Sequence, residues 1–182
     1  MRILAISGSL RASSTNTRLV RAMVALAPAD MHITIYEGLG DLPHFSPDLD
    51  GNNAPASVHN LRTQLQEADG VLICTPEYAF GVPGSLKNAL DWTVSTGDFS
   101  GKPTAAVSAS PLWGGGDKAH ASLLLTLTAL GANVPRQAKL SIPHINKKLN
   151  DNGELSDPTT AQALSAVLAA LEQAVKDLKN EK

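Results

Sequence analysis

The sequence predicts a doubly wound α/β fold, with five parallel strands in one sheet and helices on both of its faces. Apolar runs alternate with amphipathic segments five times along the chain, which is the pattern of repeated βαβ units. The runs are apolar at nearly every position, as in strands that helices cover on both faces. We therefore expect right-handed crossovers and the strand order 2-1-3-4-5, with a switch point between the first and third strands.

The strands are marked by short apolar or β-prone runs. Four of them are expected at residues 2–6, 31–36, 71–75 and 104–108. The fifth is less regular, because Pro135 cannot donate to a ladder. It is expected to start at 133–134 and to continue at 138–142.

The helices are marked by apolar residues at helical spacing. The first begins at Asn16, turns Leu19, Val20, Met23, Val24 and Ala27 to one side, and is closed by Pro28. Four more are expected at residues 57–68, 86–94, 118–130 and 159–178. The segment from Glu37 to Ala56 is irregular by composition and is predicted to be a long loop.

Composition predicts a single globular domain over residues 1–182, because 43% of the residues are hydrophobic, 18% are charged and the net charge is −2. No basic stripe suggests nucleic acid, and no apolar run is long enough to span a bilayer. The apolar stretch at residues 2–6 is too short for a signal peptide. The single cysteine, Cys74, lies in an apolar strand and is expected to be a buried thiol. We expect a cytoplasmic protein without nucleic-acid or membrane partners.

Three loops carry the candidate functional residues, and each follows a predicted strand. The first loop, residues 7–15, lacks the Gly-x-Gly-x-x-Gly and Gly-Lys-Ser/Thr patterns of dinucleotide and triphosphate sites. It leads into a helix N-terminus and suits one terminal phosphate. The expected donors are Ser9, Arg11, Ser13, Ser14, Thr15 and Asn16. The alternative is that Ser14 or Thr15 only caps the helix and that Arg11 is a solvated charge.

The second loop, residues 75–84, is rich in proline, glycine and aromatic residues, and it is expected to face a flat ligand. The residues concerned are Pro76, Glu77, Tyr78, Ala79 and Phe80. Glu77 is expected to order the loop rather than to act as a base. The alternative is that Tyr78 and Phe80 merely cover the end of the sheet.

The third loop, residues 108–117, adds Ser110 and three glycines beside Trp113, and Gly114 and Gly115 are expected to reach a ligand. A valine at position 115 is expected to hinder ligand entry and to leave the fold intact. A phosphate at the first loop and a ring system between the other two match the shape of flavin mononucleotide (FMN). Such a cofactor supplies its own chemistry, so no catalytic side chain is assigned. The five histidines form no metal-binding pattern, and no metal site is expected.

Two long motifs resemble the NADPH-dependent FMN reductases, a flavodoxin-like group that includes quinone, azo-dye and chromate reductases. They are Gly8-Ser-Leu-Arg-Ala-Ser-Ser-Thr-Asn16 and Thr75-Pro-Glu-Tyr78 with Val82-Pro-Gly-Ser-Leu-Lys-Asn-Ala-Leu-Asp-Trp92. Gly101-Lys-Pro103 also fits this group. The resemblance implies a bound FMN, NADPH or NADH as electron donor, ping-pong reduction of a small-molecule acceptor, and a homodimer or homotetramer.

By position, the resemblance assigns Ser9, Arg11, Ser14 and Asn16 to the FMN phosphate. It places Glu77 to Phe80 along the isoalloxazine ring, with Ser110 and the glycines after it at the other edge. Ala79 is a departure, because many members have asparagine there, and the loss removes a side-chain amide. Two alternatives stay open: a flavodoxin-like electron carrier without NAD(P)H turnover, and a binding or regulatory module that uses the fold without turnover.

Overall fold

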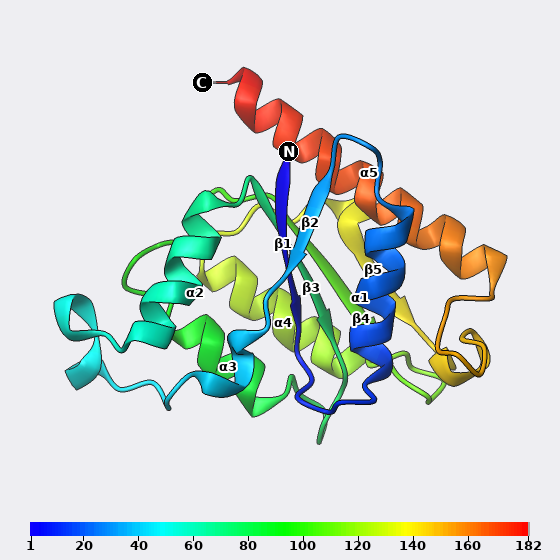
Figure 1. Cartoon of the computed structure of the whole chain (residues 1–182), viewed down its shortest axis with the longest axis horizontal. Helices are drawn as coiled ribbons and strands as arrows, with labels where there is room; N and C mark the ends of the chain where they lie inside the picture. Colours follow the sequence, from blue (N-terminus) through cyan, green and yellow to red (C-terminus); the bar gives the residue numbers. More distant parts are fainter. Residues whose placement is uncertain (182) are drawn as a thin grey trace.

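The computed structural model describes residues 1–181 and contains one five-stranded parallel sheet (Figure 1). The strands are β1 (Arg2–Ser7), β2 (His32–Ile35), β3 (Gly70–Thr75), β4 (Thr104–Ala109) and β5 (Lys139–Ile142). Their order is β2-β1-β3-β4-β5, and every neighbouring pair is parallel. The predicted topology is therefore confirmed.

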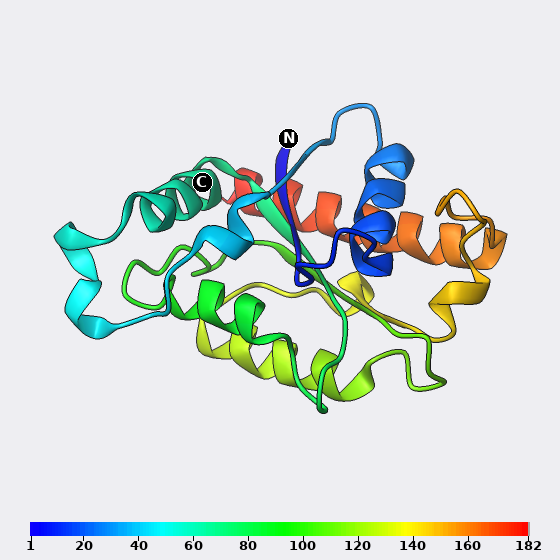
Figure 2. The same ribbon diagram turned by 60° about the horizontal axis from the view of Figure 1, so that its bottom comes forward.

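Five α-helices cover the sheet on both faces (Figures 1 and 2). They are α1 (Thr15–Leu26), α2 (Ala56–Glu67), α3 (Gly84–Asp91), α4 (Asp117–Ala129) and α5 (Pro158–Asn180). One buried cluster joins α2, α3 and α4 to the sheet, and a second joins α1 and α5 to its other face. Because both faces are covered, β3 and β4 are buried at every residue. None of the described helices combines the length and apolarity needed to cross a membrane.

Three expectations about individual elements are wrong. The fifth strand begins at Lys139, because Pro135 caps a short 3₁₀ turn and only Asn133 before it forms a bridge, to Pro103. Val24 is 38% exposed, since it lies at the rim of the apolar stripe of α1. The segment 37–56 is not wholly irregular. It contains 3₁₀ turns at Gly38–Asp41, Pro47–Leu49 and Gly51–Asn53.

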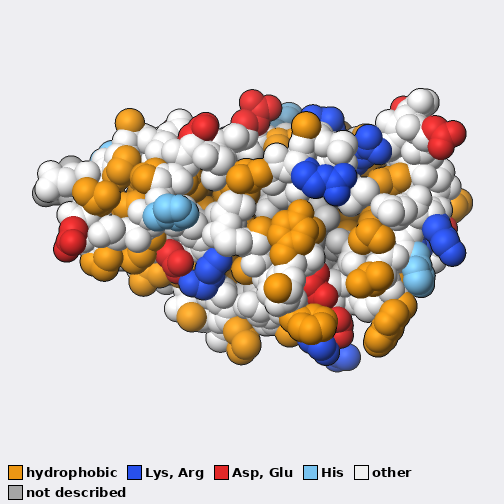
Figure 3. Space-filling view, turned by 90° about the horizontal axis from the view of Figure 1, so that it is seen from below, with side chains coloured by type: hydrophobic (Ala, Val, Ile, Leu, Met, Phe, Trp, Pro, Cys, Tyr) orange, Lys and Arg blue, Asp and Glu red, His pale blue; other side chains and the backbone are white. Residues whose placement is uncertain are grey.

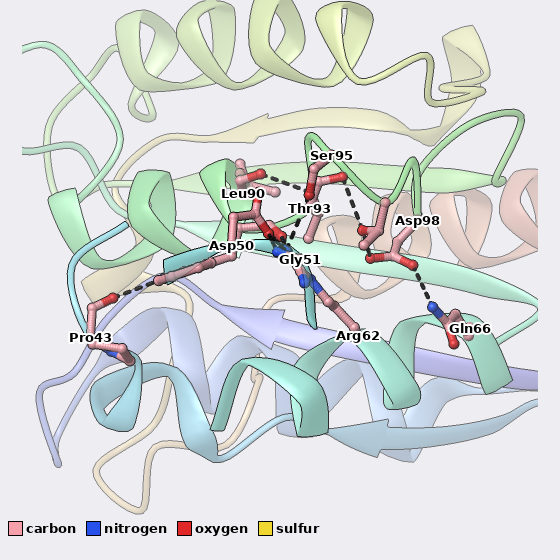
Figure 4. Close-up of polar contacts among 11 residues, drawn as sticks. Pro43, Asp50, Gly51, Arg62, Gln66, Leu90, Thr93, Ser95 and Asp98 are labelled. Atoms are coloured by element: carbon pink, nitrogen blue, oxygen red, sulfur yellow. Dashed lines mark hydrogen bonds and ion pairs between the residues drawn. The ribbon is translucent and has the colours of Figure 1, made fainter. Parts of the chain in front are cut away.

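This long segment is fastened to α2 and α3 by a buried arginine (Figure 4). The Arg62 guanidinium on α2 donates to the Trp92 carbonyl at 3.0 and 2.6 Å and to Asp50 Oδ1 at 2.6 Å. The Trp92 indole N–H donates to the Pro43 carbonyl at 2.9 Å. Earlier in the segment, Gly40 lies close to Leu10, so the fastened loop also borders the first loop.

The Asp50 carboxylate gives this attachment a pH dependence. The hydrogen bond from Arg62 lowers the pKa of Asp50 from 3.8 to about 2. Because the folded-state pKa is the lower one, the stabilisation is complete above pH 4 and is lost as the pH falls toward 2. We expect Asp50→Asn to reduce the free energy of unfolding by about 1–3 kcal/mol at pH 7, since it weakens a partly buried charged hydrogen bond.

Thermal melts of wild type and Asp50→Asn between pH 7 and pH 2.5 test this expectation. The difference in Tm should shrink below pH 4. Asp48→Asn on the adjacent 3₁₀ turn is the matched control, because the Asp48 carboxylate forms no ion pair within residues 1–181. A Tm difference that stays constant with pH would contradict the assignment.

Candidate active site at the carboxyl edge of the sheet

The three loops that the sequence singled out meet around one pocket of about 250 Å³ at the carboxyl edge of the sheet. The first loop and the start of α1 line it with Ser9, Arg11, Ser14, Thr15 and Asn16. The second loop contributes Pro76, Glu77 and Tyr78, and the third contributes Ser110. Four expected residues, Ala79, Phe80, Gly114 and Gly115, do not line this pocket.

The first loop presents donors at the positive end of α1. Ser14 is the N-cap, and its side chain accepts from the Thr17 N–H at 3.3 Å, as the capping alternative had it. Within residues 1–181, the N–H groups of Thr15 and Asn16 meet no acceptor. The Arg11 guanidinium is exposed and, among the described residues, forms no ion pair and donates only to Ser13 Oγ, at 3.2 Å. Free N–H groups and one exposed cation at a helix N-terminus are suited to an anion.

Asn16 has a structural task in addition to its place in the pocket. Its side chain is 2% exposed, and Nδ2 donates to the Ala109 carbonyl at 3.3 Å. Its Oδ1 accepts from the Cys74 thiol at 3.2 Å. Burial raises the pKa of Cys74, so the thiol stays protonated and remains a donor. The amide thus joins α1 to the ends of β3 and β4.

Glu77 joins the second loop to the third. Its carboxylate accepts from the Lys118 N–H at 2.9 Å and from the Ala119 N–H at 3.0 Å. These groups belong to the first turn of α4, whose own N-cap, Gly116, has no side chain to offer. The carboxylate therefore caps α4 from a different loop, which confirms the expected ordering role.

The tip of the second loop is a strained turn. Tyr78 and Gly81 exchange two backbone hydrogen bonds of 3.0 Å, and the two residues between them have positive φ, 49° at Ala79 and 62° at Phe80. Positive φ at both central positions defines a type I′ turn, which favours Asn-Gly. Alanine and phenylalanine are strained there, because the Cβ atom crowds the backbone. The turn carries Phe80 away from the pocket with 77% of its surface exposed.

The third loop is tied to the segment after β5. The Ser110 N–H donates to the Ile142 carbonyl at 3.2 Å, and the Ile145 N–H donates to the Ser110 carbonyl at 3.2 Å. Gly115 has φ 62°, and a Cβ there would lie 2.9 Å from backbone atoms of Ile142 and Pro143. The expectation that a valine at position 115 would leave the fold intact is therefore wrong, because this glycine packs against backbone.

Sequence reasoning missed three residues that line the pocket, namely Ala109, Pro111 and Asn146. Ala109 and Pro111 flank Ser110 and follow directly from its position. Asn146 lies on a 3₁₀ turn, Ile145–Lys147. It stands in a polar stretch of the sequence, where no motif distinguishes it as a residue of the pocket. The hydrogen bond from Ile145 to Ser110 brings this turn beside the third loop.

The titratable side chains that line the pocket are Arg11, Glu77 and Tyr78, and Glu77 is occupied by its capping bonds. His120 on α4 lies outside the pocket, and its buried Nδ1 has no hydrogen-bond partner. Burial lowers the pKa of His120, with a further contribution from Lys139, so the ring is neutral at pH 7. No group of His, Cys, Asp and Glu side chains in residues 1–181 could hold a metal ion. The donor set fits a phosphate and a ring rather than proton-transfer chemistry by the protein.

The family model for NADPH-dependent FMN reductases matches residues 1–147. The chain belongs to this family. A quinone reductase of Escherichia coli K12 is 32% identical over 98% of this chain and 97% of its own. An NAD(P)H-dependent FMN reductase of Pseudomonas aeruginosa is 31% identical over 98% of this chain and 97% of its own. These proteins match this FMN reductase family member along nearly its whole length.

Solved structures agree with the fold. The flavoenzyme NAD(P)H:acceptor oxidoreductase FerB of Paracoccus denitrificans superimposes with a TM-score of 0.87 at 30% identity, over 97% of both chains. An archaeal flavodoxin superimposes with a TM-score of 0.61 at 14% identity, over 96% of this chain and 99% of its own. The fold of this family member is therefore flavodoxin-like, as expected.

The strained turn leads to a stability prediction. We expect Phe80→Gly to raise the free energy of unfolding by about 1 kcal/mol relative to Phe80→Ala, because only glycine adopts positive φ without steric cost. Urea unfolding of the two variants measures the difference. Both changes remove the same aromatic ring, so a glycine variant no more stable than the alanine variant would refute the strain.

Proposed function

We propose that the chain binds FMN in the pocket at the carboxyl edge and transfers electrons from NADPH or NADH to a quinone or a similar small acceptor. Two observations support this: membership of the NADPH-dependent FMN reductase family, and the convergence of three loops whose donors suit a phosphate and a ring. The second observation carries the proposal that this pocket is the FMN site. The three loops are far apart in the sequence, yet their donors line one pocket.

The first loop is the proposed site of the FMN phosphate. One end of the pocket is lined by the hydroxyls of Ser9 and Ser14 and by the N–H groups of Thr15 and Asn16. These two N–H groups have no hydrogen-bond acceptor within residues 1–181. Arg11 adds the one cationic side chain among the residues that line it. A phosphate there would receive charge-assisted hydrogen bonds and would oppose the positive end of the α1 dipole.

The other two loops are the proposed site of the ring system. Pro76 and Tyr78 offer apolar surface on one side, and Ala109 and Pro111 offer it on the other. Glu77 holds the two loops at a fixed separation through α4. When bound there, FMN would supply the hydride and two-electron chemistry that links NAD(P)H to the acceptor. A quinone takes up the two electrons with two protons to give the hydroquinone.

We also propose that the protein forms a homodimer or homotetramer. Large apolar side chains crowd the face that carries the pocket (Figure 3). Leu10, Tyr78, Phe80, Leu112 and Trp113 are each more than half exposed. Apolar side chains gathered beside a pocket are typical of surfaces that another molecule covers. The cytoplasmic location expected from the sequence stays a prediction.

Anaerobic stopped-flow absorbance tests the proposed function. FMN-reconstituted protein is mixed separately with NADPH and NADH, and a benzoquinone pulse follows. We expect the oxidised-flavin band to bleach with at least one donor and to recover with the quinone, because the two half-reactions share one cofactor. A bound flavin that neither donor reduces would favour the electron-carrier alternative.

The role of Arg11 has its own test. We expect Arg11→Ala to weaken FMN binding by about tenfold to a hundredfold, since a charged hydrogen bond contributes about 1.5–3 kcal/mol. Riboflavin, which has the same ring without the phosphate, is the matched ligand and should be affected little. Fluorescence titrations of both flavins measure the two dissociation constants. Equal losses for both would show that Arg11 does not act through the phosphate.

A further inference from the structure

A second cavity lies on the outer side of α1, away from the sheet. It has a volume of about 610 Å³, within the range of small-molecule sites. Ala22, Leu26 and Ala161 contribute apolar surface, and Arg18 and Arg21 contribute cations. We call this cavity the α1 groove. A mostly apolar cavity with a few polar groups is the usual composition of a ligand site.

The two arginines of the α1 groove have no bonded partner in the part of the chain that the structure describes. They lie three positions apart and so share one side of the helix. Throughout residues 1–181, neither guanidinium forms a hydrogen bond or an ion pair, whereas the buried Arg62 has both. The first turn of α1 contains no acidic residue that would offset them. Arg18 and Arg21 therefore add to the positive potential of the helix N-terminus.

Arg18 is held in place by the turn opposite. Its side chain is half-buried and lies over Gly153, where an added Cβ would be 2.7 Å from Arg18 Cδ and Nε. The turn is itself fixed, because the Glu154 N–H donates to Asn150 Oδ1 at 2.9 Å and the Asn150 amide donates to Glu154 Oε2 at 2.9 Å. Glu154 also lines the groove but forms no ion pair with either arginine. A guanidinium positioned in this way is preorganised for an anion.

The α1 groove adjoins the candidate active site across the first loop. Ala12 lines the groove, while Arg11 and Ser14 beside it line the pocket. Figure 3 shows Lys and Arg side chains gathered next to the apolar side chains on this face of the molecule. From Thr15 to Arg21 the helix advances only about 9 Å, at 1.5 Å per residue. A dinucleotide extending from the pocket over the first loop would arrive at this groove.

We propose that the α1 groove binds the adenosine 2′-phosphate end of NADPH and gives the enzyme a preference for NADPH over NADH. This inference rests on the proposed function, since it concerns the same electron donor. The 2′-phosphate is the group that distinguishes the two donors, and arginine binds phosphate through two parallel N–H bonds. Guanidinium planes also stack on aromatic rings, which suits an adenine over the apolar floor.

Isothermal titration of the FMN-reconstituted protein with 2′,5′-ADP and with 5′-AMP tests the groove without turnover. We expect 2′,5′-ADP to bind about tenfold to a hundredfold more tightly than 5′-AMP, because only 2′,5′-ADP has the 2′-phosphate that can accept a charged hydrogen bond from the arginines. Arg18→Ala and Arg21→Ala should each remove most of this difference. Arg21 is exposed, so its variant keeps the test valid if Arg18→Ala fails to fold. Arg136→Ala, which removes an exposed charge from the 3₁₀ turn before β5, should keep the difference.

The ratio of kcat/KM for NADPH to that for NADH provides a second readout, and it should fall about tenfold in both groove variants. Equal affinities for 2′,5′-ADP and 5′-AMP in wild type would overturn the proposal. So would full competition by inorganic phosphate at the same concentration, or an equal loss in Arg136→Ala. If wild type reduces its flavin with both donors but shows none of these differences, the groove assignment fails and the proposed function stands. If neither donor reduces the flavin, the proposed function is wrong. The titration with 2′,5′-ADP and 5′-AMP then decides by itself whether the α1 groove binds a 2′-phosphate.

Discussion

The capping of α4 by Glu77 is the interaction on which the rest of the site depends. A carboxylate from the loop after β3 satisfies two N–H groups of a helix that begins after β4. Two neighbouring loops are thereby held as one unit, and the N-cap of α4 can be Gly116, whose left-handed conformation disfavours residues with a capping side chain. The second and third loops keep their separation because the Glu77 carboxylate of the second loop is bonded to the first turn of α4, which follows the third loop.

Electrostatics divides the carboxyl edge into two regions. On the α1 side lie a helix N-terminus, Arg11 and the arginines of the α1 groove, and none of these three arginines forms an ion pair within residues 1–181. On the side of the second and third loops, the single acid in the pocket is already bound, and the surroundings are proline, alanine and aromatic side chains. Anionic parts of a ligand are thus drawn to one side and its flat, uncharged parts to the other.

The sequence predicted the sheet, its order and most of the pocket, because hydrophobic periodicity and the parallel topology determine which loops share an edge. What it could not provide were features set by distant backbone. The start of β5 depended on the 3₁₀ turn that Pro135 caps and on the single bridge between Asn133 and Pro103. Gly115 could be assigned to packing only once Ile142 was known to lie beside it. The structural task of Asn16 could not be foreseen either, because the partners of its side chain, Cys74 and Ala109, lie in strands far along the chain.

The hydrogen bond between Cys74 and Asn16 has a consequence for chemical durability. Quinones are electrophiles that add to thiolates, and only the deprotonated sulfur reacts readily. The chain has a single cysteine, fully buried beneath the pocket, with a raised pKa and its proton engaged by an amide oxygen. An enzyme that passes electrons to such acceptors thus keeps its one soft nucleophile as a structural donor, out of reach of its own substrates.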